Sequence, residues 1–181
     1  REEIDLVLFI NGLPIVTMEL KNAWTGQNAK VHGQHQYKTQ RNTKQPLLNF
    51  ARCVDHFAVD TDEAYMTTKL NGRDTFFLPF NKGNKHGKGN PELPLGEIGH
   101  RTNYLWNEVF TRESLANIIQ HFVRLDGKKK DPIQTKTLFF PRYHQMDVVR
   151  KIIADASVKG VGQTYLIQHS AGSGKSNSIT W

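Results

Sequence analysis

Residues 4–21 constrain the fold of this chain more than any other stretch, because two apolar runs flank a turn signal there. The first run is Leu6–Ile10, and the second is Leu13–Leu20. Between them stands Asn11-Gly12, a dipeptide typical of tight hairpin turns. The pattern predicts a β-hairpin. Because both runs are almost continuously apolar, we expect both strands to be buried on both faces, as in the centre of a sheet.

Three charged residues, Asp5, Glu19 and Lys21, accompany these apolar runs. Charged groups are costly to bury unless something holds them, and a divalent metal ion would do so. Carboxylate oxygens are ligands that Mg²⁺ prefers, and Mg²⁺ keeps water molecules that it can activate. Lys21 follows Glu19 by two residues, so both side chains leave the same face of a strand. There the ammonium group can orient an attacking water or stabilise charge on a phosphate.

The hairpin register decides whether Asp5 and Glu19 can share a metal. A regular hairpin around a two-residue Asn11-Gly12 turn pairs Asp5 with Met18, which places the two acids on opposite faces. A shared metal needs one extra residue, in a three-residue loop or a β-bulge. We therefore predict against the regular Asn-Gly hairpin and expect Asp5 opposite Glu19. Pro14, which cannot donate to a regular ladder, is compatible with a displaced turn.

Asp5, thirteen intervening residues and the triplet Glu19-Leu20-Lys21 resemble the signature of PD-(D/E)xK nucleases. Longer stretches of the chain resemble the restriction (motor and nuclease) subunit of type I restriction enzymes, namely LVLFINGLPIVTMELKNAW, FPRYHQMDVVRKI and HSAGSGKSNSITW. The resemblance implies an ATP-dependent, site-specific deoxyribonuclease. In it Asp5 and Glu19 would bind Mg²⁺, and Lys21 would complete the catalytic set.

Many nucleases of this class carry a Gln-x-x-x-Tyr motif on the helix after the hairpin. Here we expect that helix to be capped by Thr25. Tyr37 matches the motif, but the residue four positions earlier is Gly33. Gln34 and Gln36 flank the missing position and are the candidate substitutes. Paired amides on a helix are also common on solvated surfaces, so both interpretations stay open.

The sequence pattern in the middle of the chain predicts short strands followed by helices. The strand candidates are residues 47–51, 57–59 and 65–68. Apolar residues at helical spacing predict helices over residues 104–110 and after Thr111, which is a suitable N-cap. Residues 127–132, GKKKDP, end the second helix and are the predicted linker between two domains.

A glycine-rich loop follows a predicted buried strand at residues 164–167. Such a loop at the head of a helix binds phosphate through backbone N–H groups, while Lys175 reaches the outer phosphates and Ser176 holds Mg²⁺. The loop resembles motif I of superfamily 2 helicases, although His169 stands where the full template has Gly. Gln145 resembles the glutamine that recognises adenine upstream of that motif. The ATP-binding residues implied are Gln145, Gly172, Ser173, Gly174, Lys175 and Ser176.

The net charge of +7 predicts a polyanionic partner. Basic residues gather in two loop-like segments, at Lys82, Lys85 and Lys88 and at residues 128–130. Each can be a solvated loop or a contact to a phosphate backbone. A single cysteine, Cys53, fits a reducing cytoplasm, and no apolar run has the length of a membrane span.

We therefore predict an α/β fold with a PD-(D/E)xK-type nuclease domain over residues 1–126, consisting of a mixed sheet with flanking helices. A linker at 127–132 would lead to the first strand, P-loop and helices of a RecA-like motor over 133–181. Because the first residue is Arg and few residues follow Lys175, we expect a fragment that is complete for neither activity. The implied cofactors are Mg²⁺ and ATP. The implied partners are double-stranded DNA and the specificity and modification (methyltransferase) subunits.

Two alternatives stay open. The chain can instead be interpreted as a nucleotide-binding, helicase-like remnant in which the Glu-x-Lys strand is only structural. It can also be interpreted as a non-catalytic DNA-binding or assembly module. Metal binding at Asp5 and Glu19 would distinguish the nuclease from both.

Overall fold

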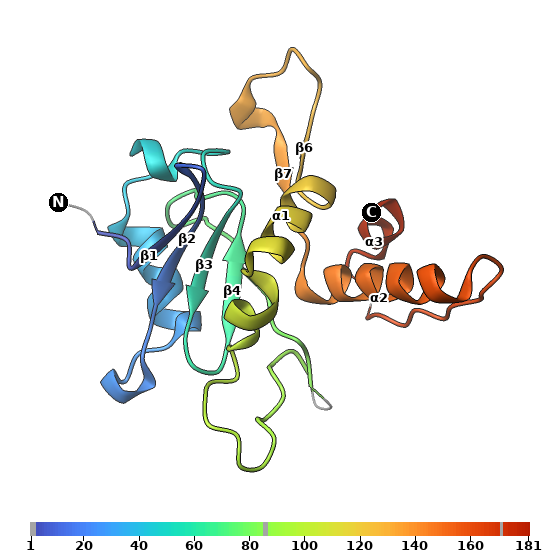
Figure 1. Cartoon of the computed structure of the whole chain (residues 1–181). Helices are drawn as coiled ribbons and strands as arrows, with labels where there is room; N and C mark the ends of the chain where they lie inside the picture. Colours follow the sequence, from blue (N-terminus) through green and yellow to red (C-terminus); the bar gives the residue numbers. More distant parts are fainter. Residues whose placement is uncertain (1–2, 85–86, 171) are drawn as a thin grey trace.

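A five-stranded mixed sheet forms the centre of the molecule (Figure 1). The computed structural model describes residues 3–84, 87–170 and 172–181. The strands lie in chain order across the sheet, and only β2 and β3 run parallel. Their bounds are Leu6–Ile10 (β1), Leu13–Leu20 (β2), Asp55–Val59 (β3), Ala64–Thr67 (β4) and Leu78–Pro79 (β5).

Helical segments cover the sheet and continue beyond it. Short 3-10 and π-helical segments are Ala23–Thr25 (η1), Ala29–Gly33 (η2), Gln36–Gln40 (η3), Pro46–Leu48 (η4), Leu105–Val109 (η5) and Ile133–Thr135 (η6). The α-helices are Arg112–His121 (α1), Tyr143–Lys159 (α2) and Lys175–Thr180 (α3). A second, two-stranded sheet pairs Arg124–Asp126 (β6) with Thr137–Phe139 (β7).

The β1–β2 hairpin contains both a two-residue turn and a β-bulge. Asn11 and Gly12 have φ angles of 49° and 80°, as a type I′ turn requires. The register then shifts by one residue, because Ile15 has no partner in β1. The predicted extra residue is confirmed as a bulge, which accompanies a two-residue Asn11-Gly12 turn in place of a three-residue loop. Beyond the bulge Leu6 pairs with Met18, which places Asp5 across from Glu19.

The two strands of the hairpin differ in burial. Residues 16–19 of β2 are buried between β1 and β3. β1 is an edge strand, and Phe9 in it is 59% exposed, as is Leu13 at the start of β2 at 66%. The prediction that both strands are buried on both faces was thus wrong for β1 and for the start of β2, where these side chains reach solvent.

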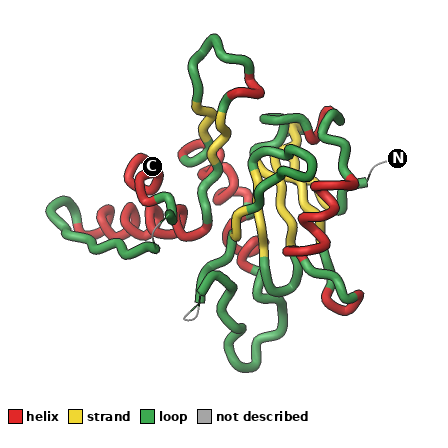
Figure 2. Tube along the Cα trace, turned by 180° about the vertical axis from the view of Figure 1, so that it is seen from behind, coloured by secondary structure: helices red, strands yellow, loops and turns green. Residues whose placement is uncertain are grey.

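A helical crossover over residues 29–40 connects β2 to the parallel strand β3. It lies across the face of the sheet that is turned to the viewer in Figure 2. Its N-cap is Asn28, whose side chain accepts a hydrogen bond from the Val31 N–H. The predicted cap, Thr25, ends the short helix η1 instead. Gly33 packs so closely on β3 that an added Cβ would lie 2.9 Å from Ala58 Cβ.

Hydrophobic residues fill both sides of the sheet. On the side of the crossover, Tyr37 packs with Ala58 and Phe77. On the other side, Met18 and Phe57 pack with residues of η5 and α1, and also with Phe140 and α2. Residues on both sides of the predicted linker therefore share one core.

The strand predictions had mixed outcomes. Residues 57–59 and most of 65–68 lie in β3 and β4, as predicted. Residues 47–51 form the end of a 3-10 helix and a turn, so that strand prediction was wrong. Pro46 explains the difference, because its fixed φ suits the first residue of a helix. Thr111 caps α1 as predicted, accepting a hydrogen bond from the Ser114 N–H.

After β7, the predicted motor segment forms two helices joined by a segment without a strand. Residues 161–170 run as an extended segment without strand pairing, and Leu166 is 93% exposed. The predicted buried strand at 164–167 was therefore wrong, because a strand needs a neighbour to satisfy its backbone groups. No RecA-like sheet is present among the described residues. The predicted linker joins two paired strands, β6 and β7.

Candidate active site

Asp5, Glu19 and Lys21 meet at the carboxyl end of β2. Lys21 Nζ lies 3.6 Å from Asp5 Oδ2 and 4.0 Å from Glu19 Oε2. Asp5 Oδ2 also accepts a hydrogen bond of 2.8 Å from the Leu20 N–H, which fixes the carboxylate against β2. The Glu19 side chain is fully buried and that of Lys21 is 9% exposed, whereas Asp5 stays in contact with solvent. The bulge at Ile15 produces this arrangement by bringing both acids to one face.

The two oxygens of Glu19 have different environments. Arg41, at the end of the crossover, donates from Nε to Oε1 over 2.6 Å. Oε2 is buried without a hydrogen-bond partner among the described residues. Burial raises the pKa of the Glu19 carboxyl, and the Arg41 hydrogen bond and charge oppose that rise. One oxygen is thus held by the Arg41 hydrogen bond, while the other has only the Lys21 ammonium group 4.0 Å away and no hydrogen bond from the described residues.

These residues fit a Mg²⁺ ion. Among the described residues no group of three or more His, Cys, Asp or Glu side chains could hold a metal. Mg²⁺ does not need one, since it commonly binds through one or two carboxylates and keeps several waters. Glu19 Oε2 and the Asp5 carboxylate would supply those two positions, and the exposure of Asp5 leaves room for water.

Three buried side chains, Thr17, Tyr37 and His56, are linked by hydrogen bonds next to Glu19. Thr17, two residues earlier on the same face of β2, has its Oγ1 2.7 Å from the Tyr37 hydroxyl and 2.7 Å from His56 Nδ1. Burial lowers the pKa of His56 to about 4 and raises the pKa of Tyr37 well above its usual range. Tyr37 therefore supports the strand that carries Glu19.

Of the two candidate amides, Gln36 is the one near the site. It lines a hollow of about 320 Å³ together with Lys21, His32 and His35. Gln34 does not line this hollow. Gly33 stands at the motif position where the glutamine is missing. A Cβ added to Gly33 would lie 3.6 Å from Lys21 Cγ, so the backbone of the crossover passes close to the Lys21 side chain.

The sequence interpretation missed Arg41, Thr17 and His56. Thr17 could have been found from strand alternation, because it shares a face with Glu19. Arg41 and His56 carry no local signal, since each reaches the site from a different element.

The glycine-rich loop lies elsewhere, beside the start of α2. Gln145 Nε2 donates to the carbonyl oxygens of Ser173 (3.1 Å) and Gly174 (3.0 Å), while its Oε1 accepts from the Arg142 N–H (2.9 Å). Lys175 Nζ donates to the carbonyl oxygens of His169 and Ser170. Ala171 lies outside the described residues. The side-chain amide of Gln145 therefore contacts the glycine-rich loop through backbone carbonyl groups of the loop.

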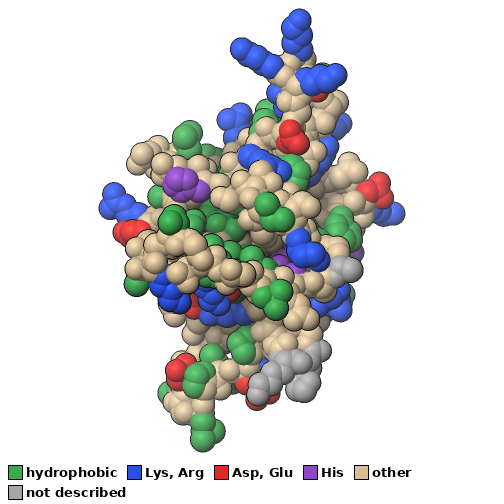
Figure 3. Space-filling view, turned by 90° about the vertical axis from the view of Figure 1, so that its right-hand side faces the viewer, with side chains coloured by type: hydrophobic (Ala, Val, Ile, Leu, Met, Phe, Trp, Pro, Cys, Tyr) green, Lys and Arg blue, Asp and Glu red, His purple; other side chains and the backbone are tan. Residues whose placement is uncertain are grey.

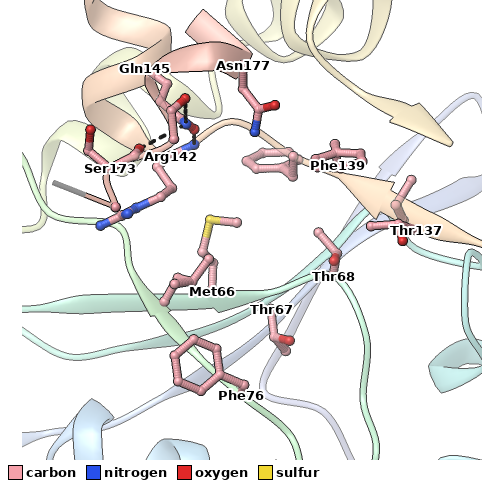
Figure 4. A pocket seen from close by; sticks show the side chains of 15 residues that line it. Met66, Thr67, Thr68, Phe76, Thr137, Phe139, Arg142, Gln145, Ser173 and Asn177 are labelled. Carbon is pink, nitrogen blue, oxygen red and sulfur yellow. Dashed lines mark hydrogen bonds between the residues drawn. The ribbon is translucent and has the colours of Figure 1, made fainter. Parts of the chain in front are cut away.

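A hollow of about 370 Å³ opens between this loop and the sheet (Figure 4). Gln145, Arg142 and Ser173 line one side, and Met66, Thr67 and Phe76 line the other. Ser173 Oγ is buried without a hydrogen-bond partner among the described residues. Gly172 and Gly174 have φ angles of 71° and 79°, which gives the loop its left-handed turns. Ser176 is exposed in the first turn of α3.

No curated protein and no solved structure matches this chain. None of the helices in the described part of the chain is long and apolar enough to cross a membrane. Residues 1–75 match the family model described as type I restriction enzyme R protein N terminus. The matched range contains Asp5, Glu19, Lys21 and Arg41 and ends before β5. This match supports a relationship between the chain and the R subunit of type I restriction enzymes.

Proposed function

We propose that this chain carries the DNA-cleaving site of a type I restriction enzyme, with Asp5 and Glu19 as ligands of Mg²⁺. The observation that carries the proposal is the buried Oε2 of Glu19, which has no hydrogen bond from the described residues and lies beside Asp5 and Lys21. A purely structural Glu-x-Lys strand gives no reason to bury a carboxylate oxygen in this way. The family match over residues 1–75 adds independent support.

Each residue has a distinct task in this proposal. Bound Mg²⁺ would supply an activated water and stabilise charge on the phosphate. Glu19 is held by Arg41 through one oxygen, so its other oxygen has a fixed direction. Lys21 would donate to the phosphate oxygen on which negative charge develops during attack by water. Gln36 lines the hollow next to Lys21 and would contact the substrate there.

We propose in addition that ATP binds at the glycine-rich loop and drives DNA translocation. The residues involved would be Gln145, Gly172, Ser173, Gly174, Lys175 and Ser176. The left-handed glycines, the position of Lys175 at the head of α3 and the buried Ser173 hydroxyl, which has no hydrogen bond from the described residues, support this proposal. The specificity and modification subunits would recognise and methylate the DNA.

Metal binding tests the nuclease site most directly. Titration calorimetry of the 181-residue chain with Mg²⁺ and Mn²⁺ should show binding that Glu19→Gln removes. Glu97→Gln, the same change in an exposed loop, should leave binding intact and serves as the matched control. Equal metal binding by the Glu19→Gln variant and the wild-type chain would contradict the proposed site.

Cleavage tests the reaction itself. In the assembled restriction enzyme, Lys21→Ala should abolish DNA nicking and preserve ATP hydrolysis. Lys30→Ala, on the exposed side of the crossover, should preserve both activities. Near wild-type nicking by Lys21→Ala would refute the nuclease assignment.

A further inference from the structure

We propose that the arm formed by residues 124–139 binds the phosphate backbone of duplex DNA through Lys128, Lys129 and Lys130. The proposal rests on the proposed function for the identity of the nucleic acid. It concerns a different part of the molecule from the Asp5–Glu19 site. We call residues 124–139 the basic arm.

The basic arm projects from the body as a narrow two-stranded ribbon (Figure 1). β6 and β7 form its stem in antiparallel register, from Arg124 opposite Phe139 to Asp126 opposite Thr137. Residues 125–135 are all exposed, and the lysines lie at the far end. Figure 3 shows basic side chains spreading from the tip of this projection.

The acidic residues of the tip shape the turn and leave the lysines unpaired. Asp126 Oδ1 accepts from the Gly127 N–H over 2.9 Å, and Asp131 Oδ2 accepts from the Lys128 N–H over 3.0 Å. None of the three lysine ammonium groups has an ion-pair or hydrogen-bond partner in the part of the chain that the structure describes. The other basic loop differs, since Lys82 is paired with Glu108, and Lys85 lies outside the described residues.

Contacts at the base hold the arm in place. Within the stem, the Arg124 guanidinium lies 4.7 Å from the centre of the Phe139 ring, and Leu138 is buried. Lys69 Nζ donates to the Gln134 carbonyl oxygen over 2.8 Å, which ties the arm to the segment after β4. A held ribbon loses less conformational entropy on binding than a free loop does, so its charges contribute more to affinity.

A basic two-stranded ribbon suits a duplex. The major groove of B-DNA is wide enough for such a ribbon, and unpaired lysines beside it reach phosphates on both strands. The arm rises at the top of Figure 1, whereas β2 runs downward there to its carboxyl end, where the Asp5–Glu19 site lies. It would therefore hold flanking DNA and contribute affinity without entering the chemistry.

The salt dependence of DNA binding tests the arm. Fluorescence anisotropy of a labelled random-sequence duplex would be measured with the 181-residue chain, without divalent metal, over a range of salt concentrations. Replacing Lys128, Lys129 and Lys130 by Ala should reduce the slope of log Kd against log salt by about 2 to 3, because each neutralised phosphate contributes roughly 0.9 to that slope. Replacing all three by Arg should retain the slope.

The matched control removes Lys151 and Lys159, which are exposed on α2 but paired with Asp147 and Asp155. Their replacement by Ala should change the slope by less than about 1. An unchanged slope in the triple Ala variant would overturn the proposal. The proposal would also be overturned if duplex RNA or polyglutamate displaced the labelled DNA as effectively as unlabelled duplex DNA does, because the partner would then belong to another class. Because this binding is measured without divalent metal, failure of the arm is distinguishable from failure of metal binding at the cleavage site.

Discussion

At Glu19 a single carboxylate is divided between the protein and a proposed cation. Arg41 takes Oε1, and Oε2 stays buried without a hydrogen bond from the described residues. A buried ion pair is expensive to break, because removing one partner leaves an uncompensated charge. Arg41 therefore matters for the stability of the site as well as for its geometry.

We expect Arg41→Ala to lower the free energy of unfolding by about 3 to 5 kcal/mol. Glu19→Gln combined with Arg41→Ala should cost less than the sum of the two single changes, since neither charge of the pair then remains. Urea unfolding of the four proteins of this double-mutant cycle measures the coupling. Additive effects would show that the pair contributes little.

His56 predicts a pH dependence of stability. Burial lowers its pKa from 6.5 to about 4, so the unfolded chain binds a proton more readily than the folded one between these values. The neutral His56 side chain therefore does not reduce the free energy of unfolding above pH 6.5. As the pH falls toward 4, proton binding to the unfolded chain lowers the free energy of unfolding by roughly 3 kcal/mol in all. Urea unfolding at several pH values should show a shallower decline for His56→Gln than for the wild type. His121→Gln, on an exposed helix end, should keep the wild-type slope.

At the scale of elements, the close contact between the crossover and β3 depends on Gly33. Its position next to Ala58 also explains the missing glutamine of the motif, because a longer side chain at this place would meet β3. Gln36, one turn later, lines the hollow that contains Lys21 instead.

We expect Gly33→Ala to destabilise the chain by about 1 to 3 kcal/mol through overpacking. The added Cβ would lie 2.9 Å from Ala58 Cβ. Adding Ala58→Gly should recover part of this loss by removing that atom, although glycine in a strand carries its own cost. Thermal unfolding of both single variants and the double variant measures the recovery. If Gly33→Ala is as stable as the wild type, the contact is not tight.

Local patterns predicted the elements whose causes are local. The Asn11-Gly12 hairpin, the Thr111 cap and the cores of β3 and β4 follow from turn chemistry and alternation. The bulge was predicted only because the chemistry of Asp5 and Glu19 demanded an extra residue. Arg41 and His56 could not be predicted, because their contacts arise from elements that meet only after folding. The strand at 164–167 failed because strand propensity without a neighbouring strand gives no ladder.

At the scale of the whole molecule, one hydrophobic core joins the two segments that the sequence divides at residues 127–132. Phe140 packs on Phe57 with ring centres 6.1 Å apart, and Tyr143 packs on Phe80 at 6.0 Å. The start of α2 is therefore held by the same core as the central sheet.

We expect Phe140→Ala to lower the free energy of unfolding by about 3 to 5 kcal/mol. The sheet and α2 should unfold in one transition in the wild type. Circular dichroism and limited proteolysis in α2 would follow that transition. Ile153→Ala, at a position 61% exposed on α2, should cost less than about 0.5 kcal/mol. Separate transitions for the sheet and α2 in the wild type would argue for two independent units.

The bulge at Ile15 makes the proposed site sensitive to chain length in an unusual way. Hairpins commonly tolerate small insertions and deletions, since their turns lie at the surface. Here Asp5 and Glu19 share a face only if the number of residues between them keeps its present parity, that is, stays odd. A substitution of Ile15 keeps that parity, and so does a change of two residues in length. A deletion of one residue would turn Asp5 away from Glu19 without altering a single catalytic side chain.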